Sequence, residues 1–500
     1  MAQSWFIETD NAFCYAPLVS DHDLNSSRTG IQLAGGQSAS KVFYEILKAT
    51  IETFPNAFAD LQFPGQPGQF KKRYIDLLPD FESLRLKSNA RHDIAEALAH
   101  RTNESMTFSD RSTTKPLSKY LHRDFSPLPV YSEPPNSNKF LLPRVSYENS
   151  DWTNLDKLAD KLLDRDVISQ GAANALCWLQ ENLPTDGTVS LSDRKVVALG
   201  ANAEMASTRQ FLDAGANVLW IDRVPPPATL VESPTRSGNL SWVAEADLLQ
   251  QPGEILATIK DFAGDEPVDL CLYAYAPGQA RELKLTLSMN AIIEALPRQL
   301  IRSITLLLSP TTATPLDSRD SRAMQSRRLN RPGWENLLDA AGLLGKGVDP
   351  AHPLVSRTLV SIQGASYQAA QYLGKLMTAE SWANRGQTSS ADSQPIQVSA
   401  NTAAITRTRS MSHPAFAAAF EGARAFQVET FTPSQSQDLN GLLTIQDWMN
   451  PAPSTPADVR VHGGIHTLPS PLESALRIAV AIGVARSPRL LPGLLLSLLR

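Results

Sequence analysis

The feature that most constrains this chain is a pair of short apolar runs joined by a helical stretch. The first run, Lys195 to Gly200 (KVVALG), ends in glycine, and the second, Asn217 to Asp222 (NVLWID), ends in an acid. Residues 201–216 between them have helical character. Strand, glycine turn, helix, strand and acid follow one another in this order in a βαβ unit that binds a dinucleotide. The pattern therefore predicts a nucleotide site at the end of the first strand.

Each part of this unit has a physical role. A tight first turn needs the conformational freedom of Gly200, and the helix start after it presents backbone N–H groups to a phosphate. Asp222 follows Gly200 by 22 residues, which suits a carboxylate that bonds the ribose hydroxyls. The candidate cofactor-binding residues of this unit are Gly200, Asn202, Ala203, Glu204, Met205, Asp222 and Arg223.

The turn departs from the strict glycine pattern. A G-x-G-x-x-G sequence places glycine at 202 and 205, where this chain has Asn202 and Met205. The carboxylate of Glu204 lies where a pyrophosphate would run, and it repels that anion unless it points away or is neutralised. This departure leaves open a domain of the same shape that binds nothing, or that binds a ligand without phosphates.

The segments that follow continue the alternation of strands and helices. Apolar runs at 239–247, 268–278 and 303–312 predict further strands, and 252–262 and 283–296 predict helices. Such alternation implies a parallel sheet with helices on both faces and ligands at the carboxyl ends of the strands. The predicted fold class is α/β, with a doubly wound, Rossmann-like core.

The chain is too long for one simple core, and we expect three regions. Helical apolar spacing at Ser83 to Arg101 and Asn154 to Leu183 predicts a helical start, and residues 107–138 between them look irregular. Asn450 to Asp458 and Gly386 to Gln394 look like linkers. The regions are a mostly helical N-terminal region (1–188), the Rossmann-like domain (189–410) and a helical C-terminal extension with an apolar tail (411–500).

Charge and composition exclude some partners. The formal net charge is -5, and no run of Lys and Arg suggests nucleic-acid binding. Three separated cysteines fit a reducing compartment, and the N-terminus lacks the pattern of a signal peptide, so we expect a cytoplasmic location. Ile478 to Ala485 and Leu490 to Leu499 are apolar but shorter than the ~18 residues of a membrane span. They predict buried or interface helices, or an anchor for a membrane surface or a partner protein; a homodimer is a further expectation.

With these residues in view, the core from about 193 to 410 resembles the short-chain dehydrogenase/reductase superfamily. The glycine spacing of that family would require glycine at 204 and 206, where Glu204 and Ala206 stand. The resemblance implies that Asp247 contacts the adenine and that Ala276 lies in a turn facing the cofactor. It also implies that Thr406 or Thr408, in PIQVSANTAAITRT, takes the place of a cofactor-binding threonine.

The same resemblance implies the catalytic residues. The family uses a tyrosine as general acid or base, a lysine four residues later that lowers its pKa, a serine and often an asparagine. Tyr367 in SYQAAQYLGKL matches the tyrosine, but Gln371 stands at the lysine position, and Lys375 comes one turn later. A displaced pair of Tyr372 and Lys375 is the alternative. Ser309 resembles the serine, Asn290 resembles the asparagine, and the segment 317–356 is an insertion that would cap the site.

Two further clusters have weaker signals. His462 and His466 have the spacing of two metal ligands on a helix, but Gly463 and Gly464 favour a turn and no acid follows where it would be needed. We therefore expect structural loop histidines and no metal site. Arg407 and Arg409 lie near the end of the sixth predicted strand, where they would accept a phosphate or an acidic substrate, or form a surface pair.

These residues predict a divergent NAD(P)-dependent oxidoreductase that transfers hydride to or from a carbonyl or alcohol of a small molecule. Asp222 would clash with a 2′-phosphate and slightly favours NAD, whereas Arg223 would pair with that phosphate and admit NADP. The alternative is a catalytically silent Rossmann-fold scaffold that binds a nucleotide, a partner protein or a membrane surface. Whether the chain is an enzyme stays open, because Gln371 supplies no cation.

Overall fold

The structure is a computed structural model of the chain. It describes residues 29–492 except for 111, 149, 185–187, 277–279, 346–354, 389–395, 412–413 and 452–458. The predicted linkers at Asn450 to Asp458 and Gly386 to Gln394 therefore lie largely outside the described residues, as does Gly278.

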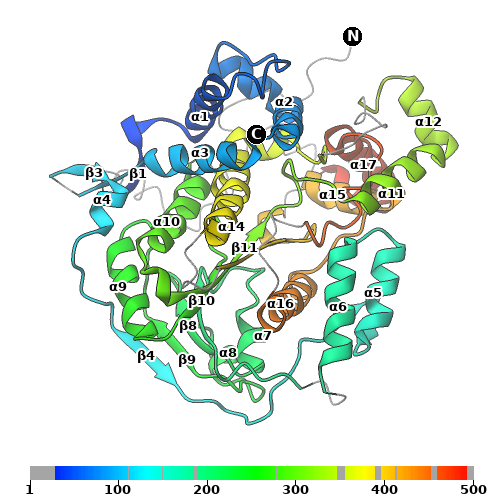
Figure 1. Ribbon diagram of the computed structural model, residues 1–500. Coiled ribbons are helices and arrows are strands. Elements are labelled where there is room, and N and C mark those ends of the chain that lie inside the picture. The colour runs from blue at the N-terminus through cyan, green and yellow to red at the C-terminus, as the bar shows by residue number, and fades with distance from the viewer. Residues whose placement is uncertain are drawn as a thin grey trace.

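Six parallel strands form the centre of the molecule (Figure 1). Along the sheet they run in the order β12-β11-β10-β7-β8-β9. From β7, the strands β8 and β9 therefore follow on one side, and β10, β11 and β12 follow on the other. This is the strand order of the Rossmann fold. The predicted fold class is confirmed. The strands are β7 (Lys195–Leu199), β8 (Asn217–Ile221), β9 (Leu240–Val243), β10 (Val268–Leu272), β11 (Ile301–Leu308) and β12 (Gln397–Thr402).

A seventh, antiparallel strand comes from the N-terminal region. β4 (Val130–Glu133) pairs with β9 at the edge of the sheet, in a segment where the sequence predicts irregular structure. The Tyr131 ring stacks on Trp242 of β9, with 5.8 Å between the ring centroids. Residues before 189 thus complete the sheet as well as covering it.

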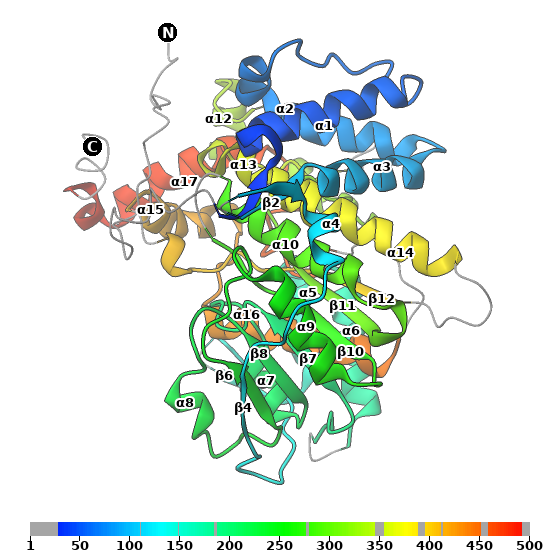
Figure 2. The same cartoon turned by 90° about the vertical axis from the view of Figure 1, so that its left-hand side faces the viewer.

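The two faces of the sheet are covered by different helices, because alternate residues of a strand point to opposite faces. Val197 and Leu199 of β7 share one core with α9 (Pro252–Ala263), α10 (Arg281–Ala295) and the π-helical segment η5 (Ala369–Met377). On this side α1 (Ala39–Thr53), α2 (Pro67–Lys87) and α3 (Arg91–Glu104) form an outer layer above α14 (Thr378–Thr388), as Figure 2 shows.

The other face carries helices from both ends of the chain. Val196 and Ala198 of β7 share a second core with α5 (Leu155–Asp164), α6 (Gln170–Asn182), α7 (Thr208–Asp213) and α16 (Pro433–Met449). The predicted helix pair at 154–183 is present, and its break lies at Arg165 to Ser169, before Gly171. The predicted helix at 83–101 is instead two helices that break at Ser88 to Ala90.

A third, smaller core joins the C-terminal helices to the insertion that follows β11. α15 (Pro414–Ala423) and α17 (Leu472–Arg486) pack on each other beside α11 (Ser318–Leu329) and α12 (Gly333–Ala340) (Figure 1). Among the described residues, no helix has the length and apolar character to cross a bilayer. Of the predicted apolar tail, residues 493–500 lie outside the described part. The remaining short elements are β1 (Gly30–Leu33), β2 (Met106–Ser109), β3 (Thr114–Pro116), α4 (Leu117–Leu121), β5 (Val145–Tyr147), β6 (Ser150–Trp152), α8 (Ala228–Val231) and α13 (Gly364–Gln368).

Candidate functional site

The candidate site lies where the strand order reverses, between the carboxyl ends of β7 and β10. Open parallel sheets bind ligands at this switch point, because the chain leaves the two strands in opposite directions and a crevice opens between them. Gly200 ends β7 with a φ of 83°. A Cβ at this position would lie 2.3 Å from the backbone nitrogen of Ala274, which follows β10. The tight turn therefore requires glycine, as the sequence indicates.

The helix after this turn begins later than the sequence predicts. α7 starts at Thr208, and residues 201–206 form irregular turns in which Thr208 Oγ1 bonds the carbonyl of Ala201. Ser207, at the helix start, is fully buried beneath α16 and donates to the carbonyl of Gln437. The expectation of a helix that opens directly after Gly200 onto a phosphate is thus wrong: α16 covers the start of the helix.

The acids expected to bind the adenosine half of a dinucleotide lie beside the first turn. Asp222 Oδ2 accepts a hydrogen bond from the Asn202 backbone N–H at 3.0 Å, so the end of β8 and the turn are joined. Burial raises the pKa of the Asp222 carboxyl, and hydrogen bonds from backbone N–H groups partly offset this rise. Arg223 Nε lies 3.5 Å from Asp247 Oδ2. The guanidinium closest to the ribose position is therefore already paired with the acid expected to contact the adenine.

Glu204 connects three loops at the mouth of the crevice. Its carboxylate accepts the backbone N–H of Arg409 at 3.0 Å and the Tyr275 hydroxyl at 3.3 Å, and Arg409 Nε lies 3.5 Å away. Arg409 supplies the positive charge that neutralises this anion. Ala203 and Met205 flank it, half-buried, in the turn. The Glu204 carboxylate thus occupies the anion position between the turn after β7 and the segment after β12.

A cavity of about 450 Å³ opens next to Glu204. Its walls come from the segment after β12, from α15 and from the residues after α17, and they carry three arginines, Arg407, Arg409 and Arg489. Thr406 lies just inside, buried, with its hydroxyl 2.6 Å from Ser436 Oγ. It faces α16 rather than the crevice, whereas Thr408 lines the cavity.

Tyr367 and Ser309 meet at the carboxyl edge of the sheet, although they are far apart in the sequence. The Ser309 hydroxyl, just after β11, lies beside the Tyr367 phenol and acts to lower its pKa. Burial raises the pKa of Tyr367 well above its usual value, and the negative charge of Glu282 raises it further. The phenol is therefore protonated at neutral pH and acts as a hydrogen-bond donor.

Gln371 and Lys375 lie deeper on the same helical segment, in contact with a buried acid. Gln371 accepts the backbone N–H of Ser309 and donates to Glu282 at 3.1 Å. Lys375 Nζ lies 3.6 Å from Glu282 Oε1 and donates to the carbonyl of Leu307. Burial disfavours both charges of this ion pair, raising the pKa of Glu282 and lowering that of Lys375. Lys375 therefore forms its ion pair with Glu282 and does not lower the pKa of a tyrosine.

Glu282 was missed in the sequence, although an acid in the first turn of the helix after the fourth strand is the signal that would have found it. Its second oxygen accepts the backbone N–H of Ala276 at 2.7 Å, so it fixes the turn after β10. Asn290, two turns further along α10, is fully buried and donates to the carbonyl of Gly374 at 2.7 Å. Asn290 therefore joins α10 to η5 instead of facing the crevice.

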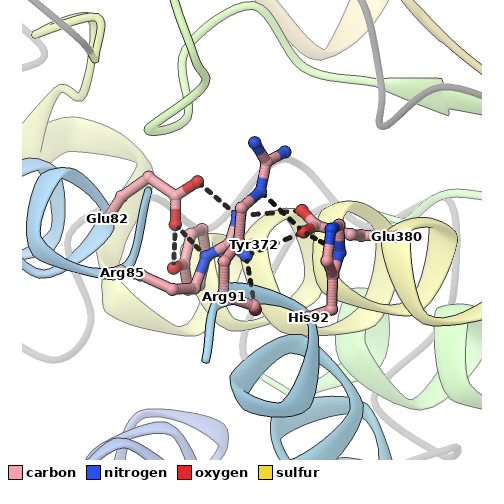
Figure 3. Close-up of polar contacts among 6 residues, drawn as sticks. All are labelled: Glu82, Arg85, Arg91, His92, Tyr372 and Glu380. Carbon is pink, nitrogen blue, oxygen red and sulfur yellow. Dashed lines mark hydrogen bonds and ion pairs between the residues drawn. The ribbon is translucent and has the colours of Figure 1, made fainter. Parts of the chain in front are cut away.

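Tyr372, the alternative acid, points into a cluster of charged side chains (Figure 3). Its phenol donates to Glu82 at 2.6 Å within a buried cluster that contains Arg85 and Glu380. Arg85 makes paired hydrogen bonds to both carboxylates, at 2.7 to 2.9 Å. Tyr372 therefore belongs to a structural network between η5, the N-terminal helices and α14.

Comparisons with known proteins were made for sequence and for structure. No family model matches the sequence, and no curated protein is similar to it. Among solved structures, the chain is similar to a short-chain dehydrogenase/reductase, a glucose/ribitol dehydrogenase from Brucella melitensis (15% identity, TM-score 0.33, covering 56% of this chain and 98% of that one). It is also similar to MalC reductase/Diels-Alderase from Malbranchea aurantiaca (13% identity, TM-score 0.34, covering 59% and 98%).

The residues around the Gly200 turn suit the adenosine half of a dinucleotide better than its diphosphate. Asp222, the acid expected to bind the ribose, follows β8 and accepts a hydrogen bond from the turn after Gly200. At the diphosphate position, the Glu204 carboxylate already takes the N–H of Arg409. A dinucleotide would therefore bind across the switch point when the Glu204 side chain turns out and leaves Arg409 to the phosphates.

Proposed function

We propose that this crevice is the active site of an NAD(P)-dependent reductase for a small-molecule carbonyl. The observation that carries the proposal is the meeting of the Tyr367 and Ser309 hydroxyls at the carboxyl edge of a Rossmann-ordered sheet, one strand from the switch point. Two hydroxyls that converge at this edge suit a carbonyl oxygen, since both can donate to it. The nicotinamide ring, when bound, supplies the hydride.

The electrostatics of Tyr367 favour reduction over oxidation in this proposal. A general base must lose its proton near neutral pH, and burial and Glu282 oppose that loss. A reduced carbonyl is a strongly basic alkoxide and takes a proton from a phenol of high pKa. Tyr367 would thus act as the proton donor, and Ser309 would hold the oxygen in place.

A catalytically silent nucleotide-binding scaffold is the second candidate. Two ion pairs favour it, because Glu282 neutralises Lys375 and Glu204 occupies Arg409. These pairs engage the charges that a tyrosine base and a diphosphate would need. A scaffold would bind the nucleotide and leave every carbonyl unchanged.

Tyr367→Phe is the decisive variant, with Tyr131→Phe as its control. Tyr131 is an exposed tyrosine on the edge strand β4, so Tyr131→Phe removes the same hydroxyl group far from the crevice. Turnover of NADH or NADPH against a panel of aldehydes and ketones should disappear in Tyr367→Phe and persist in Tyr131→Phe. Cofactor affinity in Tyr367→Phe should stay within about threefold (~0.6 kcal/mol).

Cofactor binding itself is measured by quenching of tryptophan fluorescence with NADH and with NADPH. Asp222→Asn should weaken binding, and it is a better variant than Gly200→Val because a side chain at 200 would displace Ala274. Saturable binding without turnover of any carbonyl favours the scaffold. Absence of quenching by either cofactor at millimolar concentration contradicts both candidates, and NAD and NADP are distinguished in the same titration.

A further inference from the structure

Three titratable side chains meet in a buried cluster outside the crevice. Asp320 lies in the first turn of α11, and His462 and His466 lie in the loop before α17. Each is at most 2% exposed, and one ligand-type atom from each lies within 4.8 Å of the others. The acid that the histidine pair lacks in sequence is thus supplied by the insertion after β11.

The cluster contains polar atoms that the described residues leave without a hydrogen bond. They are Asp320 Oδ1, His462 Nε2 and His466 Nδ1. His462 Nε2 lies 3.3 Å from Asp320 Oδ2, and the two imidazole rings stack with 4.6 Å between their centroids. Buried polar groups nearly always have a partner, so three buried side chains that share one long ion pair and each carry an atom without a well-formed hydrogen bond point to a ligand that satisfies them together.

We propose that Asp320, His462 and His466 bind a first-row divalent transition-metal ion, with zinc best suited to this donor set. Two imidazole nitrogens and a carboxylate oxygen are common zinc ligands. Zinc ligands at 2.0 to 2.1 Å stand about 3.4 Å apart in a tetrahedral site, so ligand atoms that lie within 4.8 Å of one another need to approach by at most about 1.4 Å. A water molecule would complete the coordination.

The two histidines differ in how much each must rearrange before it can bind a metal ion. His466 Nε2 lies 3.4 Å from the Thr314 hydroxyl, the kind of outer partner that holds a metal-bound imidazole by its second nitrogen. His462 Nδ1 accepts the N–H of Gly464 at 3.1 Å. For Nε2 to bind the ion, the proton must move to Nδ1 and this N–H must be released, so the glycine turn shifts when the metal binds.

The position of the cluster indicates a structural role, because it lies where several chain segments meet. The N–H groups of His462 and Gly463 bond the carbonyl of Val167, and Gly463 accepts the N–H of Glu429. Thr314 belongs to the segment that leads from Ser309 to α11. An ion here would hold the loop at 460–466, the insertion and the segment behind Ser309 in one arrangement.

Metal content of the purified full-length chain tests this proposal. After incubation with zinc and desalting, the chain should retain an equimolar amount by elemental analysis, and its melting temperature should rise. Cobalt in place of zinc should give the intense visible absorption of a four-coordinate ion. These measurements need no variant and therefore do not depend on whether a mutant folds.

Asp320→Asn and His466→Asn assign the ligands, with His100→Asn as the matched control. His100 also lies 3.3 Å from a carboxylate, that of Glu104, but this pair is exposed. Thr314→Val, which removes only an outer partner, should weaken zinc binding about 10- to 100-fold, and each ligand variant should weaken it more. The control should bind as tightly as the wild type. A wild-type chain that retains no metal, or ligand variants that retain as much as the control, would overturn the proposal.

Discussion

Two tyrosines on adjoining helical turns differ in how far their hydroxyls are engaged by charged partners. Tyr367 lies half-buried beside one hydroxyl, that of Ser309, at the carboxyl edge of the sheet. Tyr372 faces the N-terminal helices, where Glu82, Arg85 and Glu380 satisfy one another (Figure 3). The Tyr367 hydroxyl is thus available to a ligand, whereas the Tyr372 hydroxyl is engaged in contacts that stabilise the fold.

The Figure 3 cluster should show the largest loss of stability when it is broken. In Arg85→Met, the carboxylates of Glu82 and Glu380 stay buried without their shared cation. Removing one partner of a buried ion pair costs about 3–5 kcal/mol, and urea denaturation should report a loss in this range. Lys48→Met removes an exposed cation from its pair with Glu52 and should change stability by less than about 1 kcal/mol. If the two variants lost equal stability, the hydrogen-bonded ion pairs of Arg85 would not be formed in solution.

The Glu282–Lys375 pair at the crevice is smaller and should lose about 3 kcal/mol in either single variant. Lys375→Met leaves Glu282 buried and charged, and Glu282→Gln leaves Lys375 in the same state. Because each variant removes the same attraction, the double variant should cost clearly less than the sum of the singles. Additive losses in a double-mutant cycle would mean that the two charges, 3.6 Å apart, do not interact.

The tyrosines themselves provide the most direct test of the contrast. Tyr372→Phe removes the donor to a buried carboxylate and should cost about 1–3 kcal/mol of stability. Tyr367→Phe removes a hydroxyl whose described partner, Ser309, also bonds Thr311, so its cost should be under about 1 kcal/mol. Thermal denaturation of both variants measures the difference. The reverse order would assign the structural role to Tyr367.

The sequence predicts the sheet well and the charges around it poorly. Runs such as KVVALG and NVLWID predict their strands because buried parallel strands are apolar throughout. The late start of α7 depends on α16, more than 200 residues away, through the bond of Ser207 to Gln437. Glu204 and Arg409 lie 205 residues apart and Arg85 and Glu380 lie 295 apart, and no local pattern specifies such pairs.

The smallest expected effect concerns Glu204 and tests how the crevice receives a dinucleotide. Glu204→Gln removes the negative charge from the diphosphate position and frees the guanidinium of Arg409, so affinity for NADH or NADPH should rise about tenfold (about 1.4 kcal/mol). Stability should change little, because Gln can still accept the N–H of Arg409. Glu232→Gln, a change of the same charge on the other side of β8, serves as the control in the fluorescence titration. If Glu204→Gln instead weakened binding, the carboxylate would be part of the ligand site, and the bound molecule would have to present a donor or a cation to it.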